Sequence, residues 1–172
     1  MKRLIPFLLI FIFCSENSIP PNLIGLEELI PSKCTIHFGD RTEKIDCESL
    51  FDESLNGFVW SYSENEKCEN AVLTYYFQNA VKIDYLILEN LATYKEYKIR
   101  DRLKILETTY DDFGFKMDSF YPEDTSEIQY FGMEREKTQQ INIYVIRAYQ
   151  SENYFLSSSK NECAFGSIKF YG

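Results

Sequence analysis

Short runs of apolar residues, each bounded by polar or turn-forming residues, recur along most of this chain. Several runs alternate apolar and polar positions, which is the period of a half-buried strand. Residues 82–88 are instead apolar on both faces and predict a central strand, whereas 139–146 is the longest clean run. We expect strands at 34–38, 58–62, 71–77, 82–88, 103–109, 115–120, 127–131, 139–146 and 165–171.

The spacing of these runs predicts an all-β fold without an amphipathic helix longer than a turn or two. Short turns between strands favour antiparallel pairing. About eight or nine such strands make an antiparallel β-sandwich, for which a jelly roll is the natural closure. The single tryptophan, Trp60, follows an Asn56-Gly57 turn and is expected in the core of this sandwich; the alternative is a platform on which a sugar stacks.

The start of the chain predicts export. A basic beginning is followed by an apolar run at 4–13 that is too short to span a bilayer as a helix. Cys14 follows directly and resembles the acylated cysteine of a bacterial lipoprotein; the alternative is a signal that is cleaved without lipidation. The expected location is the outer membrane or cell surface for a lipoprotein, or the periplasm. The chain divides into a signal peptide at 1–13, a tether at 14–33 and one domain at 34–172.

The chain is acidic, with a formal charge of −9 that becomes more negative once the basic start is removed. Such a surface repels the phosphates of nucleic acids and anionic lipid head groups, and no basic run along the sequence offsets it. We therefore expect no nucleic-acid partner, and contact with a membrane only through the lipid anchor.

Four cysteines remain after Cys14, an even number that predicts two disulfide bonds in an exported protein, with three possible pairings. No Cys-x-x-Cys pair occurs and His37 is the single histidine, so no zinc site or other metal site is expected. His37 is expected to be a strand residue and not a catalytic base. The disulfide candidates are Cys34, Cys47, Cys68 and Cys163.

Several motifs follow one another in a recognisable order. Leu50-Phe51-Asp52 and a short turn precede Trp60, and the apolar strand 81–87 comes later. This order resembles that of discoidin-like domains, also called galactose-binding-like domains. The resemblance is closer to the bacterial NADase-type glycan-binding domain, through Arg102-Leu103-Lys104-Ile105 and the closing segment 164–172. It implies a jelly-roll β-sandwich that binds glycans.

The resemblance covers roughly residues 45–172 and fails at positions that matter for metal binding. In many relatives an aspartate loop and a glutamate of the closing strand hold calcium, which needs several oxygen ligands. Here Asp52 and Asn56 remain as candidates. The departures from the family pattern are Glu53, Leu91 and Ser167.

The polar connection 90–102 combines tyrosine rings with directional hydrogen-bond donors, as sugar recognition requires. The loop from Tyr149 to Cys163, which contains Tyr154 and Phe155, has the same character. The alternative is that these are solvated loops whose arginines pair with the surplus acids. The expected ligand-binding residues are Tyr62, Asn90, Tyr94, Tyr97, Arg100 and Arg102.

The sequence contains no catalytic motif: no Gly-x-Ser-x-Gly elbow, phosphate-binding glycine loop or dinucleotide fingerprint. Asp84, between Ile83 and Tyr85, is the one acid in an apolar setting. We expect no enzyme activity and no cofactor. The leading hypothesis is an exported glycan-binding module, and the alternative is an envelope module that packs against surface proteins and binds no sugar. A secreted hydrolase is the weaker rival.

Calcium is expected to leave the melting temperature unchanged, because too few oxygen ligands remain in the opening motif. Calorimetry of the metal-free protein before and after calcium addition tests this. A clear upward shift on titration contradicts it.

Overall fold

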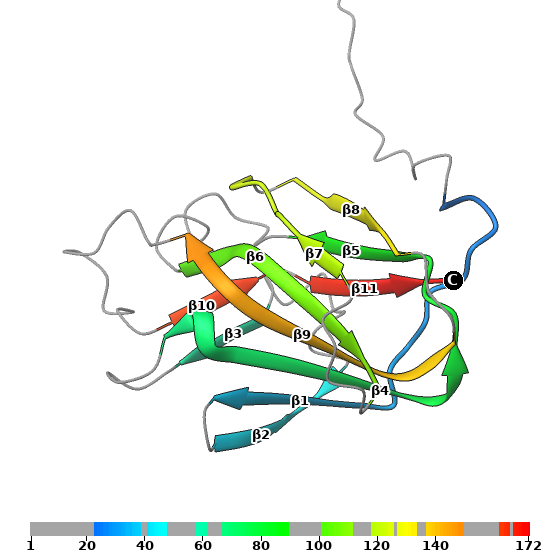
Figure 1. Ribbon diagram of the computed structural model, residues 1–172, viewed down its shortest axis with the longest axis horizontal. Coiled ribbons are helices and arrows are strands. Elements are labelled where there is room, and N and C mark those ends of the chain that lie inside the picture. Colours follow the sequence, from blue (N-terminus) through cyan, green and yellow to red (C-terminus); the bar gives the residue numbers. More distant parts are fainter. Residues whose placement is uncertain are drawn as a thin grey trace, which may run out of the picture.

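Two β-sheets stack face to face and form the predicted β-sandwich (Figure 1). No helix among the described residues has the length and apolar character needed to cross a membrane. The computed structural model describes residues 23–38, 41–47, 58–61, 67–89, 101–111, 118–125, 127–133, 137–149, 162–165 and 167–172.

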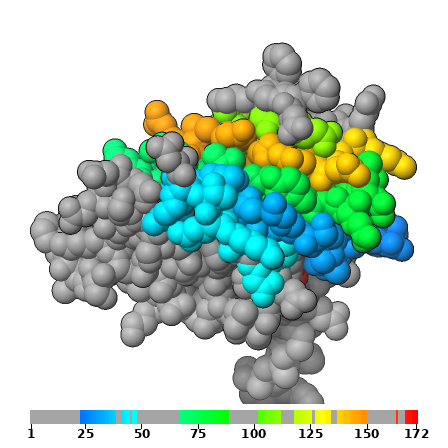
Figure 2. Space-filling model, turned by 90° about the horizontal axis from the view of Figure 1, so that it is seen from below, coloured from blue at the N-terminus to red at the C-terminus, as the bar shows by residue number. Residues whose placement is uncertain are grey.

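The larger sheet contains eight strands within the described residues. They are β1 (Lys33–Phe38), β2 (Arg41–Ile45), β3 (Phe58–Ser61), β4 (Ala71–Val81), β6 (Asp101–Tyr110), β7 (Asp118–Phe120), β9 (Thr138–Tyr149) and β10 (Glu162–Phe165). Their spatial order is β2–β1–β4–β9–β6–β10–β3, with β7 also paired to β6. Figure 2 shows β2, β1, β4 and β9 as neighbouring bands on one face. All pairs are antiparallel except β6 and β10, which run parallel.

The smaller sheet has three strands in the described structure, β5 (Tyr85–Glu89), β8 (Gln129–Gly132) and β11 (Ser167–Tyr171). β5 lies in the middle, as its apolar run predicts. Leu86 and Leu88 are fully buried, and Ile87 on the opposite face is only 8% exposed. The prediction of a central strand is therefore confirmed.

The core lies between the two sheets and follows the alternation of the sequence. On β4, Leu73, Tyr75 and Phe77 point inward, while Val72 and Tyr76 are partly exposed. The ring of Phe170 on β11 meets the ring of Tyr75 edge-on, with 4.9 Å between centroids. Such aromatic pairs favour this geometry, so the contact joins the two sheets at a defined spacing.

The segment beginning at Leu23 packs along the outer edge of β11. Glu27 and Gly172 exchange two backbone hydrogen bonds of 3.1 Å, and the Leu29 amide donates to the Phe170 carbonyl at 2.8 Å. The described part of the predicted tether is thus held against the smaller sheet. Residues 1–22, with the predicted signal peptide and Cys14, lie outside the described residues.

Strand boundaries differ from the expected ones in two informative places. The sequence missed β2, an edge strand of mostly charged and polar residues, because edge strands carry charges that discourage aggregation and so lack a hydrophobic signal. The expected final strand 165–171 is wrong as a single unit. β10 ends at Phe165 in the larger sheet and β11 begins at Ser167 in the smaller one.

Tyr75 is a buried polar side chain with an unusual environment. It is 0% exposed, and its hydroxyl has no hydrogen-bond partner within the described structure. Burial raises the pKa of the Tyr75 phenol well above its ordinary value. The folded protein therefore keeps this phenol neutral at alkaline pH, whereas the unfolded chain releases its proton.

Tyr75→Phe is expected to raise the free energy of unfolding by about 1 kcal/mol, because it removes an unsatisfied buried hydroxyl. The advantage should grow above pH about 10, where the unfolded wild-type chain gains stability by ionising the phenol. Urea unfolding at neutral and alkaline pH measures both effects, with Tyr121→Phe at a 68% exposed position as control. A Tyr75→Phe protein less stable than wild type would overturn the expectation.

Candidate functional site

Several strand ends meet at one end of the larger sheet. Ser61, the last residue of β3, pairs with Glu162 at the start of β10. Asp101, which opens β6, pairs with Cys163, and Arg102 pairs with Tyr149 at the end of β9. The connections after β3, before β6 and after β9 therefore begin or end at neighbouring strand ends.

Most of the ligand residues expected from the sequence belong to these connections. Because they lie outside the described residues, their role in binding stays a prediction, although the strand ends next to their connections lie close together. Trp60 lies on β3 opposite Cys163, and its predicted place in the core is not tested. The expected residues concerned are Tyr62, Asn90, Tyr94, Tyr97 and Arg100.

Arg102 lies within β6, and its side chain is committed to an internal ion pair. The guanidinium is 3% exposed, and its Nε and Nη2 atoms donate to the two Asp124 carboxylate oxygens at 2.8 and 3.0 Å. Asp124 belongs to the segment that passes from β7 in the larger sheet to β8 in the smaller one. Arg102 thus fastens this crossover to β6, and its predicted ligand contact remains a separate prediction.

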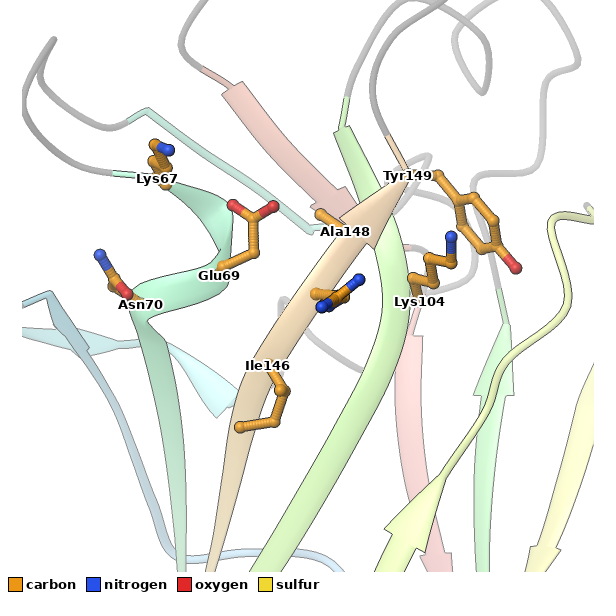
Figure 3. A pocket seen from close by; sticks show the side chains of 8 residues that line it. Lys67, Glu69, Asn70, Lys104, Ile146, Ala148 and Tyr149 are labelled. Atoms are coloured by element: carbon orange, nitrogen blue, oxygen red, sulfur yellow. The ribbon is translucent and has the colours of Figure 1, made fainter.

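A cleft of about 720 Å³ opens beside the converging strand ends. One wall is the 3₁₀ helix η3 (Cys68–Asn70), and the other is formed by the ends of β9 and β6, as Figure 3 shows. The Cys68–Cys163 disulfide bond fastens η3 to β10 at this end of the sheet. The cleft is lined by Lys67, Glu69, Asn70, Lys104, Ile146, Arg147, Ala148 and Tyr149.

Tyr149 is the aromatic residue among those that line the cleft, and two contacts hold its side chain. Its hydroxyl donates to the Pro122 carbonyl at 3.3 Å, and the Lys104 Nζ lies 4.9 Å from its ring centroid. Asn70 and Glu69, on η3, line the same cleft and offer a hydrogen-bond donor and acceptors. An aromatic ring with directional polar groups is a combination suited to a sugar ring and its hydroxyls.

Sequence reasoning singled out the loop that starts at Tyr149 but missed the other polar residues of the cleft. Lys67, Glu69 and Asn70 lie far along the chain from Arg147. They meet only because η3 packs against β9 and is bonded to β10. The even count of cysteines signalled that such a bond exists, but not which residues it brings together.

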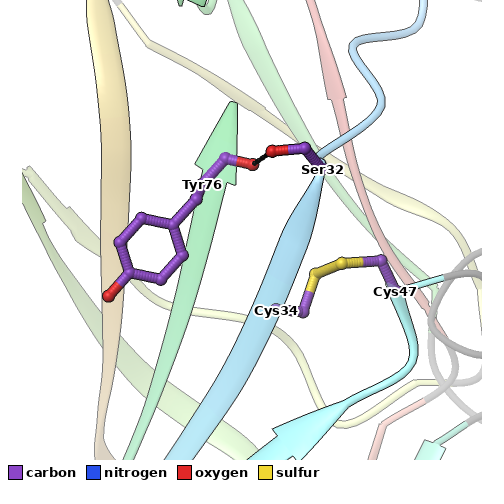
Figure 4. Close-up of a disulfide and its surroundings, with 4 residues drawn as sticks. All are labelled: Ser32, Cys34, Cys47 and Tyr76. Atoms are coloured by element: carbon purple, nitrogen blue, oxygen red, sulfur yellow. Dashed lines mark hydrogen bonds between the residues drawn. A yellow bond between two sulfur atoms is a disulfide. The ribbon is translucent and has the colours of Figure 1, made fainter. Parts of the chain in front are cut away.

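A second, smaller hollow lies where the N-terminal segment meets β1 and β2. Beside the hollow, the Cys34–Cys47 disulfide bond closes the hairpin of β1 and β2. The Ser32 hydroxyl donates to the Tyr76 carbonyl at 3.1 Å (Figure 4). The two disulfide bonds confirm the expected number, and the structure selects one of the three pairings. These contacts fasten the entering chain to the sheet. The hollow is lined by Ile30, Pro31, Ser32, Lys33, Lys44, Asp46 and Cys47.

The described residues contain no group of three or more histidine, cysteine or acidic side chains that could hold a metal ion. Asp52 and Asn56 lie outside the described residues. The ring nitrogens of His37, on β1, contact the hydroxyls of Thr35 and Thr42 at 3.1 and 2.8 Å. Asp84 receives a charged hydrogen bond from Lys82, so its surroundings are polar and not apolar as the sequence indicated.

In comparisons of sequence, no family model and no curated protein matches this chain. Solved structures do share its fold. One is the family 32 carbohydrate-binding module of NanJ from Clostridium perfringens, in complex with galactose. It is 10% identical, with a TM-score of 0.59 over 86% of this chain and 99% of that one.

Two further modules agree with this result. CpGH89CBM32-5 from Clostridium perfringens, in complex with GalNAc-β-1,3-galactose, is 9% identical, with a TM-score of 0.56 over 85% of this chain and 100% of that one. The family 32 module of EndoD from Streptococcus pneumoniae is 10% identical, with a TM-score of 0.56 over 84% and 99%. The discoidin-like fold is confirmed, whereas the narrower resemblance to the NADase-type glycan-binding domain stays a prediction.

Asp124→Asn is expected to lower the free energy of unfolding by about 2 to 4 kcal/mol. Removing one charge of a buried ion pair leaves the other charge buried without a partner, which destabilises the fold. The partial exposure of Asp124 reduces this loss of stability. Chemical denaturation measures the change, and Glu123→Gln, an exposed neighbour on the same segment, should stay near wild type. Equal stability of Asp124→Asn and wild type would show that the ion pair does not hold the crossover.

Proposed function

We propose that this protein is an exported, non-catalytic module that binds glycans in the cleft between η3 and the ends of β9 and β6. The observation that carries the proposal is the cleft itself, which places a fixed tyrosine ring among polar side chains beside the converging strand ends. The shared fold with modules solved in complex with galactose or GalNAc-β-1,3-galactose supports a sugar as ligand.

The composition of the cleft supports binding over hydrolysis. Glycoside hydrolysis in most enzyme families uses a pair of carboxyl groups on either side of the scissile bond. Among the described residues that line the cleft, Glu69 is the one carboxylate. A single carboxylate is suited to accept hydrogen bonds from sugar hydroxyls. The described lining does not supply the second carboxyl group that this hydrolysis mechanism uses.

The position of the cleft supports presentation of the site away from a membrane anchor. β4 begins next to Asn70 in the cleft and ends at Val81, about 30 Å away by the rise of an extended strand. At that far end Gly172 lies beside Lys82 and bonds to Glu27. The first described residues therefore lie at the end opposite the cleft (Figure 1), which supports a cleft that faces away from an anchor at Cys14.

A screen of the purified protein on a glycan array is expected to detect binding to galactose-containing glycans. Tyr149→Ala should weaken the affinity about tenfold by removing the ring, whereas Tyr149→Phe should retain most of it. Titration calorimetry gives the affinities, and thermal unfolding shows that each variant is folded.

Tyr121→Ala is the matched control, because Tyr121 is an exposed tyrosine that does not line the cleft. Its affinity should equal that of wild type. If no glycan on the array binds the folded protein, the proposal fails and the envelope interaction module becomes the better account.

A further inference from the structure

Three cationic side chains gather in the cleft of a chain that is acidic overall. They are Lys67, Lys104 and Arg147, and the carboxylate that lines the cleft with them is Glu69. Among the described residues, none of the three forms an ion pair with a carboxylate. Three other described cations are paired, Arg41 with Glu43, Lys82 with Asp84 and Arg102 with Asp124, whereas the exposed Lys33, Lys44 and Lys137 are spread singly or in a pair elsewhere on the described surface.

Among the described residues, Lys67 and Arg147 make neither an ion pair nor a ring contact that would give them a role in the fold. Lys67 and Arg147 are exposed, and Lys104 is half-buried over the Tyr149 ring. Like charges brought to one hollow repel each other, which slightly disfavours the folded state. A net positive cleft is, however, complementary to an anion. At physiological salt, charges are screened beyond about 8 Å, so the cleft acts on a bound ligand more strongly than the distant acidic surface does.

We propose that the cleft selects sugars that carry a negative charge, either a carboxylate or a sulfate ester; this proposal rests on the glycan-binding function proposed above. The Arg147 guanidinium offers paired donors that match a carboxylate or sulfate group, and the two lysines add positive charge without a fixed geometry. Tyr149, which lines the same cleft (Figure 3), supplies the ring against which the sugar packs. Glu69 and Asn70 bind hydroxyl groups, which is how the site distinguishes an acidic sugar from a simple anion.

The test compares galactose, galacturonic acid and galactose 6-sulfate in titrations of the full protein. At least one of the two charged sugars should bind about tenfold more tightly than galactose, since each exposed ion pair adds a modest increment. The pair of charged sugars shows whether a carboxylate or a sulfate is preferred. Raising the sodium chloride concentration should reduce the preference, because salt screens the cations.

Variants that remove one positive charge test whether the preference for charged sugars arises in the cleft. Arg147→Gln and Lys67→Gln should each reduce the ratio of charged-sugar to galactose affinity about threefold. Lys137→Gln is the matched control, because Lys137 is an exposed lysine just before β9, at the opposite end of that strand from Tyr149. It should leave the ratio at the wild-type value.

The outcomes separate this inference from the function on which it rests. Equal affinity for charged and neutral sugars overturns the inference and leaves the glycan-binding function standing. Competition by inorganic sulfate as strong as by the sulfated sugar also overturns it, because the cleft is then a plain anion site. Failure of every sugar to bind overturns the glycan-binding function itself.

Discussion

The Cys68–Cys163 disulfide bond is the constraint on which the described cleft depends. It joins residues 95 positions apart and fastens η3 to β10. Because β10 runs beside β6 and η3 packs against β9, the bond determines how the two walls of the cleft face each other. A cross-link over a loop of about 100 residues is worth about 4.7 kcal/mol in the chain-entropy model, so it also limits how far the unfolded chain expands.

Further contacts stabilise the end of the sandwich that carries the cleft. The Arg102–Asp124 ion pair fastens the crossover between the sheets directly beside Tyr149, which is the β9 partner of Arg102 and whose hydroxyl bonds to Pro122 on the same crossover. The aromatic contact between Tyr75 and Phe170 joins the sheets within the core. The proposed binding surface thus rests on strands of the sandwich, and the described N-terminal segment is fastened at the opposite end, away from the cleft.

The apolar pattern predicted the sandwich well. Strands with one buried face alternate apolar and polar residues, and the central strand β5 is apolar on both faces. The pattern failed at β2, whose charged residues lie on an edge, and at the change of sheet after Phe165, which depends on pairing far along the chain. The candidate site was harder to predict. Lys67 and Arg147 carry no local signal, and only a disulfide bond and sheet register bring them together. Arg102 looked like a loop donor, yet its partner Asp124 is recognisable only in the folded structure.

The sequence indicated an acidic surface without a basic run, and the fold gathers unpaired cations at one end of it. This contrast gives the cleft its proposed preference for charged sugars. The most direct test of the account is a two-dimensional amide NMR titration with galacturonic acid or galactose 6-sulfate, whichever binds more tightly. The account predicts that the largest shifts fall on Asn70, Lys104, Ala148 and Tyr149, around the cleft. Shifts confined to the hollow near Ile30 and Lys44, or absent at saturating sugar, would contradict it.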